Sequence, residues 1–417
     1  MPLFYSIMEL NQDRYEIGGI PVGDLCSRYD TPLYVYHTAK MEQQYKRLER
    51  AFSGTPLRIN YACKALSNIN VLKYFKSLGA GLDTVSIQEV LIGLKAGFAP
   101  GDIIYTPNCV SLAEIGMAVD LGVKINIDNI SILEQFGHRY GSSVPVCIRF
   151  NPHIMAGGNV KISTGHIDSK FGISIHQLRH VQRVIASEKI RVSGLHMHTG
   201  SDILDVDVFL RGADILLEIA QDFKDLEYID FGSGFKVAYK TDDVTTDIEM
   251  LGEKMSERFH TFCKNYGRQL TLMFEPGKFL VSESGYFFAK VNVIKQTTAT
   301  VFAGVDSGLN HLIRPMFYDS YHHIINVSNP SATPRIYTVV GYICETDTFG
   351  WDRKIAEIRE GDVLCFLNAG AYGYMMSSNY NSRFRPAEVL IREGKDHLVT
   401  KRETLDDLLK NQVEIGI

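Results

Sequence analysis

The chain has 417 residues, of which 45% are hydrophobic and 22% are charged, and its formal net charge is −5. This length and composition are typical of a globular protein with a sizeable core and two domains. The charges are interspersed, without the basic excess of a nucleic-acid binder, and no apolar run is long enough for a membrane span, so we expect neither kind of partner.

Over the first two thirds of the chain, short apolar runs rich in β-branched residues alternate with segments of helical spacing. Such alternation is typical of βαβ units and a parallel sheet. Eight units over roughly 230 residues match the size of a (β/α)8 barrel, which we expect over residues 36–285. The eight strand-like runs are Leu57–Cys63, Gly81–Val85, Ile103–Thr106, Lys124–Ile127, Val144–Phe150, Val192–Met197, Leu226–Phe231 and Leu270–Phe274.

The pattern changes after Gly285, where strand-like runs follow with little helical periodicity. An earlier run, Leu33–Tyr36, also resembles a strand, and we expect it to pair with them. The sequence therefore predicts a separate β-domain, sandwich-like or barrel-like, from residues 1–35 and 286–417. Its later runs are Tyr286–Lys295, Ala299–Val305, Arg335–Cys344, Asp362–Leu367 and Ala387–Arg392.

The cysteines suggest a compartment. There are seven, an odd number, and none forms a CxxC pair. This argues against a disulfide framework or a structural zinc site and favours a reducing environment. The first twenty residues also lack the basic and apolar regions of a signal peptide. We therefore expect a cytoplasmic protein.

Polar residues gather where the predicted barrel strands end, which is where barrel enzymes carry their chemistry. These residues are Lys64, Asp83, Arg149, Asn151, His198, Gly200, Ser201, Gly232, Ser233, Gly234 and Glu275. Lys64 lies in an apolar context, where a lysine is costly unless paired. It is either an imine-forming lysine with a lowered pKa or an ion-paired structural lysine, and the residue alone slightly favours the second.

The other rim residues also allow two interpretations each. His196 and His198 point to one face of a strand. No third ligand at metal spacing is evident, so a stacked or hydrogen-bonded role is favoured over a metal site. The Gly232–Gly234 turn can cradle a phosphate or can be only a turn, and Glu275 can hold a protonated pyridine nitrogen or cap a turn. Together these are the parts of a site for pyridoxal 5′-phosphate (PLP).

The motifs resemble the fold-type III PLP-dependent decarboxylases, which include enzymes acting on ornithine, arginine and diaminopimelate. The resemblance covers nearly the whole chain, in order and spacing. The motifs are Tyr61–Ala65 (YACKA), Gly194–Ser201 (GLHMHTGS), Asp230–Gly234 (DFGSG), Glu275–Lys278 (EPGK), Leu312–Tyr318 (LIRPMFY), Cys344–Asp347 (CETD) and Gly370–Tyr372 (GAY).

Within this family, three stretches look like the branch that decarboxylates meso-2,6-diaminopimelate to L-lysine. They are Gly370–Val389 (GAYGYMMSSNYNSRFRPAEV), Ser163–Gly165 with Lys170–Gly172, and the LIRPMFY motif ahead of Tyr321 and His322. The resemblance implies lysine biosynthesis as the pathway and a homodimer with shared active sites as the assembly.

The resemblance also implies roles for individual residues. Lys64 would bind PLP as an imine and assist proton transfer, and His198 would stack on the cofactor ring. Cys344, supplied by the partner subunit, would protonate the product. The cofactor-binding residues would be Lys64, Asp83, His198, Ser201, Gly232, Ser233, Gly234, Glu275, Gly277, Lys278 and Tyr372, with Glu275 on the pyridine nitrogen. The substrate would be bound by Lys278, Arg314, Tyr318, Glu345 and Tyr372.

Three features depart from the family pattern. The fourth motif ends in Lys278 where arginine is usual, and an ammonium does not copy a guanidinium's bidentate contacts. The glycine turn carries Ser233 where the family usually has glycine, and Phe235 where it usually has a smaller or aliphatic residue. The loop at residues 157–161 lacks the usual histidine.

Three other functions are compatible with parts of this pattern. A sister decarboxylase for ornithine, arginine, lysine or carboxynorspermidine is the alternative, and an alanine-racemase-like enzyme ranks lower. Such a racemase typically places an arginine, not a glutamate such as Glu275, at the ring nitrogen. A silent regulatory paralogue has no physical need for Lys64, Glu275 and Cys344 together.

Overall fold

The computed structural model describes residues 8–154, 169–240 and 242–416. They form two compact units. The first, called the barrel unit, comprises residues 42–237 and 244–280. The second, called the sheet unit, comprises residues up to 41, the short segment 238–243 and the chain from 281 onward.

The barrel unit contains a closed ring of eight parallel strands, as the sequence predicted. Each strand pairs with the next, β9 also pairs with β8, and β13 pairs with β5 to complete the ring. The two-residue strand β10 (Ile173–Ser174) adds to β9. The ring strands are β5 (Leu57–Ala62), β6 (Gly81–Thr84), β7 (Ile103–Tyr105), β8 (Lys124–Ile127), β9 (Val146–Asn151), β11 (Val192–Met197), β12 (Tyr228–Asp230) and β13 (Thr271–Phe274).

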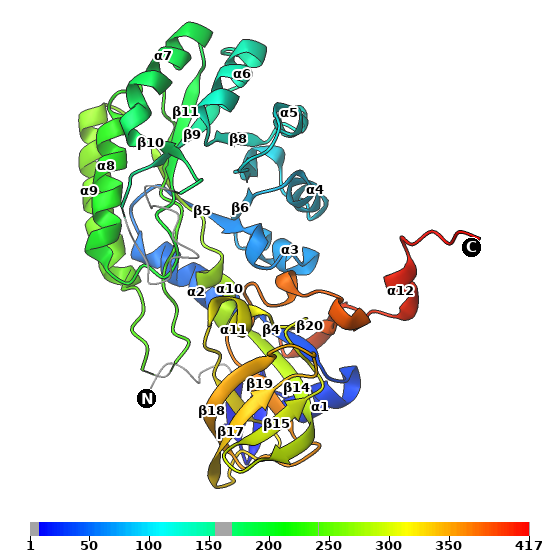
Figure 1. The fold of residues 1–417 in the computed structure, drawn as a ribbon. Coiled ribbons are helices and arrows are strands. Elements are labelled where there is room, and N and C mark those ends of the chain that lie inside the picture. The colour runs from blue at the N-terminus through cyan, green and yellow to red at the C-terminus, as the bar shows by residue number, and fades with distance from the viewer. Residues whose placement is uncertain (1–7, 155–168, 241, 417) are drawn as a thin grey trace. The chain divides into compact units, whose positions relative to one another are not determined.

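Helices surround the ring of strands, as Figure 1 shows for α3 to α9. Polar side chains fix where they begin: the Ser86 hydroxyl accepts the Glu89 N–H at 3.2 Å, and Ser111 does the same for Glu114 at 3.3 Å. Such N-caps contribute about 1 kcal/mol each. The helices are α3 (Ile69–Ser77), α4 (Ile87–Lys95), α5 (Leu112–Asp120), α6 (Ile130–Tyr140), α7 (Leu178–Glu188), α8 (Val206–Ala220) and α9 (Ile248–Tyr266). Two more, α2 (Thr38–Ala51) and α10 (Lys278–Val281), run across the unit borders.

The sheet unit is built around one large, mostly antiparallel sheet. Its order is β18-β17-β15-β14-β4-β20-β21, with β19 on β14 and β16 on β19. The strands are β4 (Leu33–His37), β14 (Gly285–Gln296), β15 (Val301–Val305), β16 (Ile324–Asn326), β17 (Pro334–Val340), β18 (Thr348–Ala356), β19 (Val363–Phe366), β20 (Ala387–Arg392) and β21 (Lys395–Thr400). The expected pairing of Leu33–Tyr36 is confirmed: β4 lies between β14 and β20.

The N-terminal part of this unit adds a small antiparallel sheet of three strands. Unlike the sequence prediction, the unit also contains short helices. The strands are β1 (Met8–Asn11), β2 (Arg14–Ile17) and β3 (Ile20–Pro21), and the helices are α1 (Val22–Tyr29), α11 (Arg314–Tyr318) and α12 (Leu405–Leu409). Within the described residues, no helix combines the length and apolar character needed to cross a lipid bilayer.

In the sheet unit, one predicted strand continues well past the observed one. The run Arg335–Cys344 was expected to be extended throughout, but β17 ends at Val340. The reason is Asp347, whose carboxylate accepts the N–H groups of Leu309 at 2.6 Å and Ile343 at 2.9 Å. These bonds fold the chain into a tight turn, which places Cys344 outside the sheet ladder in an exposed bend.

Candidate active site

The C-terminal ends of the barrel strands bring several buried polar groups to one rim. Asp83 lies on β6, Arg149 on β9, His196 on β11 and Asp230 on β12, and Glu275 follows β13; each side chain is buried. Strands of a parallel barrel all end at the same face. Residues distant in sequence thus form one cluster.

Lys64 lies on this rim but differs from its expected setting. It follows β5 in a single 3-10 turn, Cys63–Ala65, and it is exposed, whereas its neighbours Cys63 and Ala65 are buried. The apolar sequence around Lys64 therefore does not bury its side chain. Its charge still acts on the rim, where it favours ionisation of Asp83 and Glu275.

Glu275 and His196 form a buried pair. One oxygen of the carboxylate, Oε2, lies 3.0 Å from His196 Nε2. The other oxygen, Oε1, and His196 Nδ1 are buried and have no N–H or hydroxyl partner among the described residues. A buried acceptor without a donor is costly, so Oε1 is suited to receive an N–H group from a bound molecule.

Three buried carboxyl groups on the rim divide into one charged and two neutral members. Burial and the Glu275 charge raise the pKa of Asp83 to about 8, against the opposing effect of Lys64. Burial, the Glu275 charge and a hydrogen bond from the protonated Asp230 carboxyl to Glu275 raise the pKa of Asp230 well above its usual value. Burial alone would raise the pKa of Glu275, but His196 and Lys64 outweigh it and hold this pKa below its usual range. Glu275 therefore carries the negative charge.

His198 is held as a neutral ring. Its Nδ1 accepts the backbone N–H of Ser233 at 3.3 Å, so the ring proton lies on Nε2. Burial, with the positive charges of Arg149 and Lys64, lowers the pKa of His198 well below its usual value. A neutral, half-buried imidazole fixed at one edge is suited to stacking against a flat aromatic ligand.

The turn after β12 requires its glycines. Gly232 and Gly234 have φ angles of 62° and 109°, a region that L residues rarely adopt. A Cβ on Gly234 would lie 2.1 Å from the Gly200 carbonyl oxygen, and one on Gly232 would lie 2.6 Å from His198 Nδ1. The turn thus brings bare backbone beside His198 and Gly200, as a phosphate cradle requires.

Phe235, an unusual residue next to this turn, has a structural explanation. Its ring packs against Phe274 at 5.5 Å, Phe279 at 5.7 Å and Phe209 at 6.0 Å between centroids. The large residue therefore fills an aromatic cluster beneath the rim.

The EPGK segment joins two parts of the rim. The Pro276 carbonyl accepts the Ala62 N–H at 3.2 Å, and a Cβ on Gly277 would lie 3.0 Å from that of Ala65. Lys278, the first residue of α10, forms an ion pair with Asp202 at 2.5 Å. Ser201 and Asp202 follow the end of β11.

The rim residues fit PLP. The unpartnered Glu275 Oε1 matches a protonated ring nitrogen, and the Gly232–Gly234 turn leaves room for an anion. The cluster His196, Asp230 and Glu275, whose donor atoms all lie within 4.8 Å of one another, could also hold a metal ion. The spacing of the sequence did not indicate this cluster. The raised pKa of Asp230 favours the cofactor, because metal ligands must be deprotonated.

In the sheet unit, Arg314 lies in an aromatic cage. Its guanidinium carbon lies 5.7–5.8 Å from the ring centroids of Tyr239, Tyr318 and Tyr372. The side chain is buried, its Nε has no partner, and no carboxylate of the described residues lies within ion-pair distance. A buried guanidinium of this kind is suited to an incoming carboxylate. The sequence did not indicate Tyr239, which comes from the segment 238–243.

Cys344 and Glu345 form a second group in the sheet unit. Asn381 Nδ2 donates to Cys344 Sγ at 3.6 Å, and the Tyr380 hydroxyl donates to Glu345. The bond to Glu345 raises the pKa of Tyr380 to about 12. Tyr380 and Asn381 belong to the SSNYN stretch, so a signal for them was present in the sequence although no role was assigned. Both Cys344 and Glu345 are exposed.

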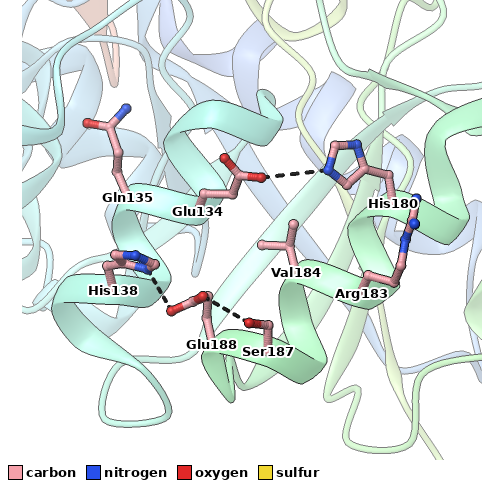
Figure 2. Close-up of a pocket in the computed structure, with 8 residues that line it drawn as sticks. All are labelled: Glu134, Gln135, His138, His180, Arg183, Val184, Ser187 and Glu188. Atoms are coloured by element: carbon pink, nitrogen blue, oxygen red, sulfur yellow. Dashed lines mark hydrogen bonds and ion pairs between the residues drawn. The ribbon is translucent and has the colours of Figure 1, made fainter.

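A groove on the outside of the barrel unit lies between α6 and α7 (Figure 2). Two histidine–carboxylate pairs cross it: His138 with Glu188 at 2.6 Å and His180 with Glu134 at 3.6 Å. His138 and Glu188 lie in the last turns of their helices, which face the opposite end of a barrel from the catalytic rim. We assign these exposed pairs to helix packing, where each contributes up to about 1 kcal/mol.

Some of the sequence expectations cannot be placed. The 157–161 loop and the Ser163–Gly165 stretch lie outside the described residues. Of their neighbours, Phe171 is described, and Arg149 stacks over its ring at 5.0 Å from the centroid.

Comparison with known proteins places this arrangement in a family. A family model described as "Pyridoxal-dependent decarboxylase, pyridoxal binding domain" matches residues 38–282. The chain is 40% identical over 406 residues to diaminopimelate decarboxylase of Methanothermobacter thermautotrophicus, with 95% of each chain covered. It is 34% identical over 399 residues to the Haemophilus influenzae enzyme of the same name, covering 93% of this chain and 95% of the relative.

Solved structures agree. The crystal structure of diaminopimelate decarboxylase from M. jannaschii in complex with L-lysine aligns with a TM-score of 0.91, at 30% identity and with 99% of both chains covered. The family resemblance expected from the motifs is therefore confirmed. The chain belongs to the diaminopimelate decarboxylases, within the pyridoxal-dependent decarboxylase family.

Proposed function

We propose that the protein decarboxylates meso-2,6-diaminopimelate with PLP as cofactor, releasing CO2 and L-lysine as the last step of lysine biosynthesis. The observation that carries this proposal is the buried Glu275, held ionised by His196 and Lys64, whose Oε1 has no N–H donor among the described residues. When bound, PLP supplies a sink for the electrons left by the departing carboxyl group. The sink requires a protonated ring nitrogen, and a carboxylate at that position stabilises the proton.

Other rim residues hold and orient the cofactor in this proposal. Lys64 binds it covalently and then moves protons with its amine. The neutral His198 ring stacks on the cofactor, with its orientation fixed by the Ser233 N–H. Asp83, largely neutral, adds no competing charge next to Glu275.

The phosphate end of the proposed site is mainly backbone. Ser201 and the glycine turn, Gly232–Gly234, present hydroxyl and N–H groups, and Gly277 keeps the EPGK segment close to the Lys64 turn. Lys278 and Tyr372 complete the set of proposed phosphate-binding residues.

The substrate carries both signs of charge at the end that does not react, so its site needs a cation and an anion. In our proposal Arg314, in its aromatic cage, binds the distal carboxylate, and Glu345 binds the distal ammonium. Lys278, Tyr318 and Tyr372 complete the substrate-binding set. An enzyme for ornithine needs only the acidic partner, because ornithine has no second carboxylate.

We also propose that Cys344 protonates the carbon from which CO2 has left. A thiol can act as the general acid for this step. The Asn381 amide fixes the sulfur. In this proposal the protein is a homodimer, and each active site receives Cys344 of the partner subunit. A cytoplasmic location fits the seven free thiols.

The reaction can be tested by its stoichiometry. Purified protein loaded with PLP should convert meso-diaminopimelate to lysine and CO2 in equal amounts. Lysine formed without CO2, or CO2 formed without lysine, would contradict the proposal.

A further inference from the structure

The ion pair between Lys278 and Asp202 is more buried than most in this protein. The Lys278 side chain is 10% exposed and that of Asp202 is 29% exposed. The Lys278 Nζ atom lies 2.5 Å from Asp202 Oδ1. An ammonium with so little water around it needs a counter-charge, and Asp202 supplies one.

The pair lies beside the glycine turn. Asp202 is followed by Ile203, whose N–H donates to the Gly234 carbonyl at 2.8 Å and which forms a parallel bridge with Phe235. Asp202 also has a φ angle of 60°, in the left-handed region that aspartate adopts more readily than most residues other than glycine. Its backbone is thus held in a fixed turn next to the proposed phosphate cradle.

On the other side, Lys278 is joined to the Lys64 turn. It directly follows Gly277, which packs on Ala65, and Pro276, which bonds to Ala62. The ion pair therefore connects the β11 end of the rim to the β5 end, across the end of β13.

We propose that Asp202 is a positioning residue that holds and neutralises the Lys278 ammonium, so that the pair adds hydrogen-bond donors but no net charge at the phosphate end. Lysine has three N–H donors, and one is used on Asp202. The affinity for an anion there is then set by the glycine turn and by the balance of the two charges. This inference rests on the proposed cofactor site but not on the identity of the substrate.

The test is a charge cycle on the full-length protein: wild type, Asp202→Asn, Lys278→Met and the double variant. Asparagine tolerates positive φ, so Asp202→Asn keeps the turn while removing the charge. Each protein, freed of cofactor by dialysis, is titrated with PLP and with pyridoxal, which lacks the phosphate, and binding is followed by absorbance. Glu227→Gln is the matched control, because Glu227 pairs with Arg191 at the other end of the barrel strands.

We expect Asp202→Asn to lower the Kd for PLP, because a negative charge near the phosphate is lost. Lys278→Met should raise it on the order of tenfold. The double variant should return to within about twofold of wild type, since both forms are neutral. Pyridoxal affinity should change little in any of them, and Glu227→Gln should bind both ligands like wild type.

Two results would overturn the inference. If the double variant binds PLP as weakly as Lys278→Met, the lysine acts as an independent cation and Asp202 does not balance it. If pyridoxal affinity changes as much as PLP affinity, the pair acts only on the fold of the rim. A wild-type protein that binds no PLP would refute the proposed function itself, which separates the two failures.

Discussion

At the scale of single residues, burial and neighbouring charges decide which acid on the rim is ionised. Asp83, Asp230 and Glu275 are all buried, yet only Glu275 has a histidine donor, and only its pKa falls. The other two stay protonated because burial disfavours their charged forms, and because a second negative charge beside Glu275 is unfavourable. The single negative charge therefore lies on Glu275, where it can stabilise the proton of a pyridinium nitrogen.

This assignment predicts a pH effect on stability. The Asp83 carboxyl has a pKa of about 8 in the folded protein, raised by burial from 3.8. Between these values the folded state keeps a proton that the unfolded state loses. The stability that the protonated Asp83 carboxyl contributes to the folded state is therefore fully present below about pH 4 and is lost as the pH rises toward 8.

Asp83→Asn cannot ionise and should escape this loss. We expect its free energy of unfolding at pH 8 to exceed that of wild type by at least about 1 kcal/mol, with a smaller difference at pH 5. Denaturant unfolding of the cofactor-free protein at both pH values measures this. The exposed Asp120→Asn should behave like wild type, and a gain independent of pH would contradict the charge assignment.

Arg314 allows a second prediction at this scale. Arg314→Ala should raise KM for diaminopimelate about 100-fold, because it removes a charge-assisted, bidentate contact. PLP affinity should change far less. The KM of Arg314→Lys should lie between those of wild type and Arg314→Ala, since lysine keeps the charge without the planar guanidinium. Equal losses of substrate and cofactor affinity would show that the cage is only structural.

At the scale of elements, the turn after β12 places the phosphate cradle. Its conformation depends on the absence of side chains, because Gly234 has a φ angle of 109° and touches the Gly200 carbonyl. We expect Gly234→Ala to cost about 2 kcal/mol or more in stability and to weaken PLP binding.

Gly101→Ala is the control for this variant, since nothing lies within 4 Å of the added methyl group. Its stability should stay within about 0.5 kcal/mol of wild type. Thermal unfolding of both variants gives the comparison. Similar effects of the two substitutions would show that the glycine turn is not constrained.

The sequence predicted strands best where the hydrophobic pattern of a segment matches the burial of its residues in the fold. The eight barrel strands are apolar runs separated by helices, most of which begin with a side-chain N-cap, and all eight strands were found. Strand β18 was missed because Thr348–Ala356 carries Asp352, Arg353 and Lys354, which break the apolar alternation expected of a strand.

The candidate site was predicted in its residues but not in its contacts. Motifs identified Lys278 and Arg314, whereas their partners Asp202 and Tyr239 come from other segments, and only the folded chain brings them together. Likewise the exposure of Lys64 follows from a turn that residue type does not reveal.

At the scale of the whole molecule, the chemistry is divided between two units. The barrel unit carries Lys64 and Glu275, and the sheet unit carries Arg314, Cys344 and Glu345. Our proposal that Cys344 serves the active site of the partner subunit makes the dimer the catalytic unit.

Mixing two inactive variants tests this proposal. Lys64→Ala and Cys344→Ala homodimers should each be nearly inactive. After exchange of subunits, mixed dimers contain one site with both residues intact, so activity should recover to about a quarter of wild type at equal amounts. Mixtures of Lys64→Ala with Glu275→Gln, both on the barrel unit, should not recover. No recovery in the first mixture would place Cys344 and Lys64 in the same subunit's site.

The substrate of the enzyme can be tested directly by one assay. CO2 release should be measured from meso-diaminopimelate, ornithine, lysine and arginine under identical conditions, with PLP-loaded wild type and Lys64→Ala. We predict release from diaminopimelate alone, and none from the Lys64→Ala variant. Faster release from ornithine, lysine or arginine would contradict the account, because it would show that Arg314 does not select for a second carboxylate.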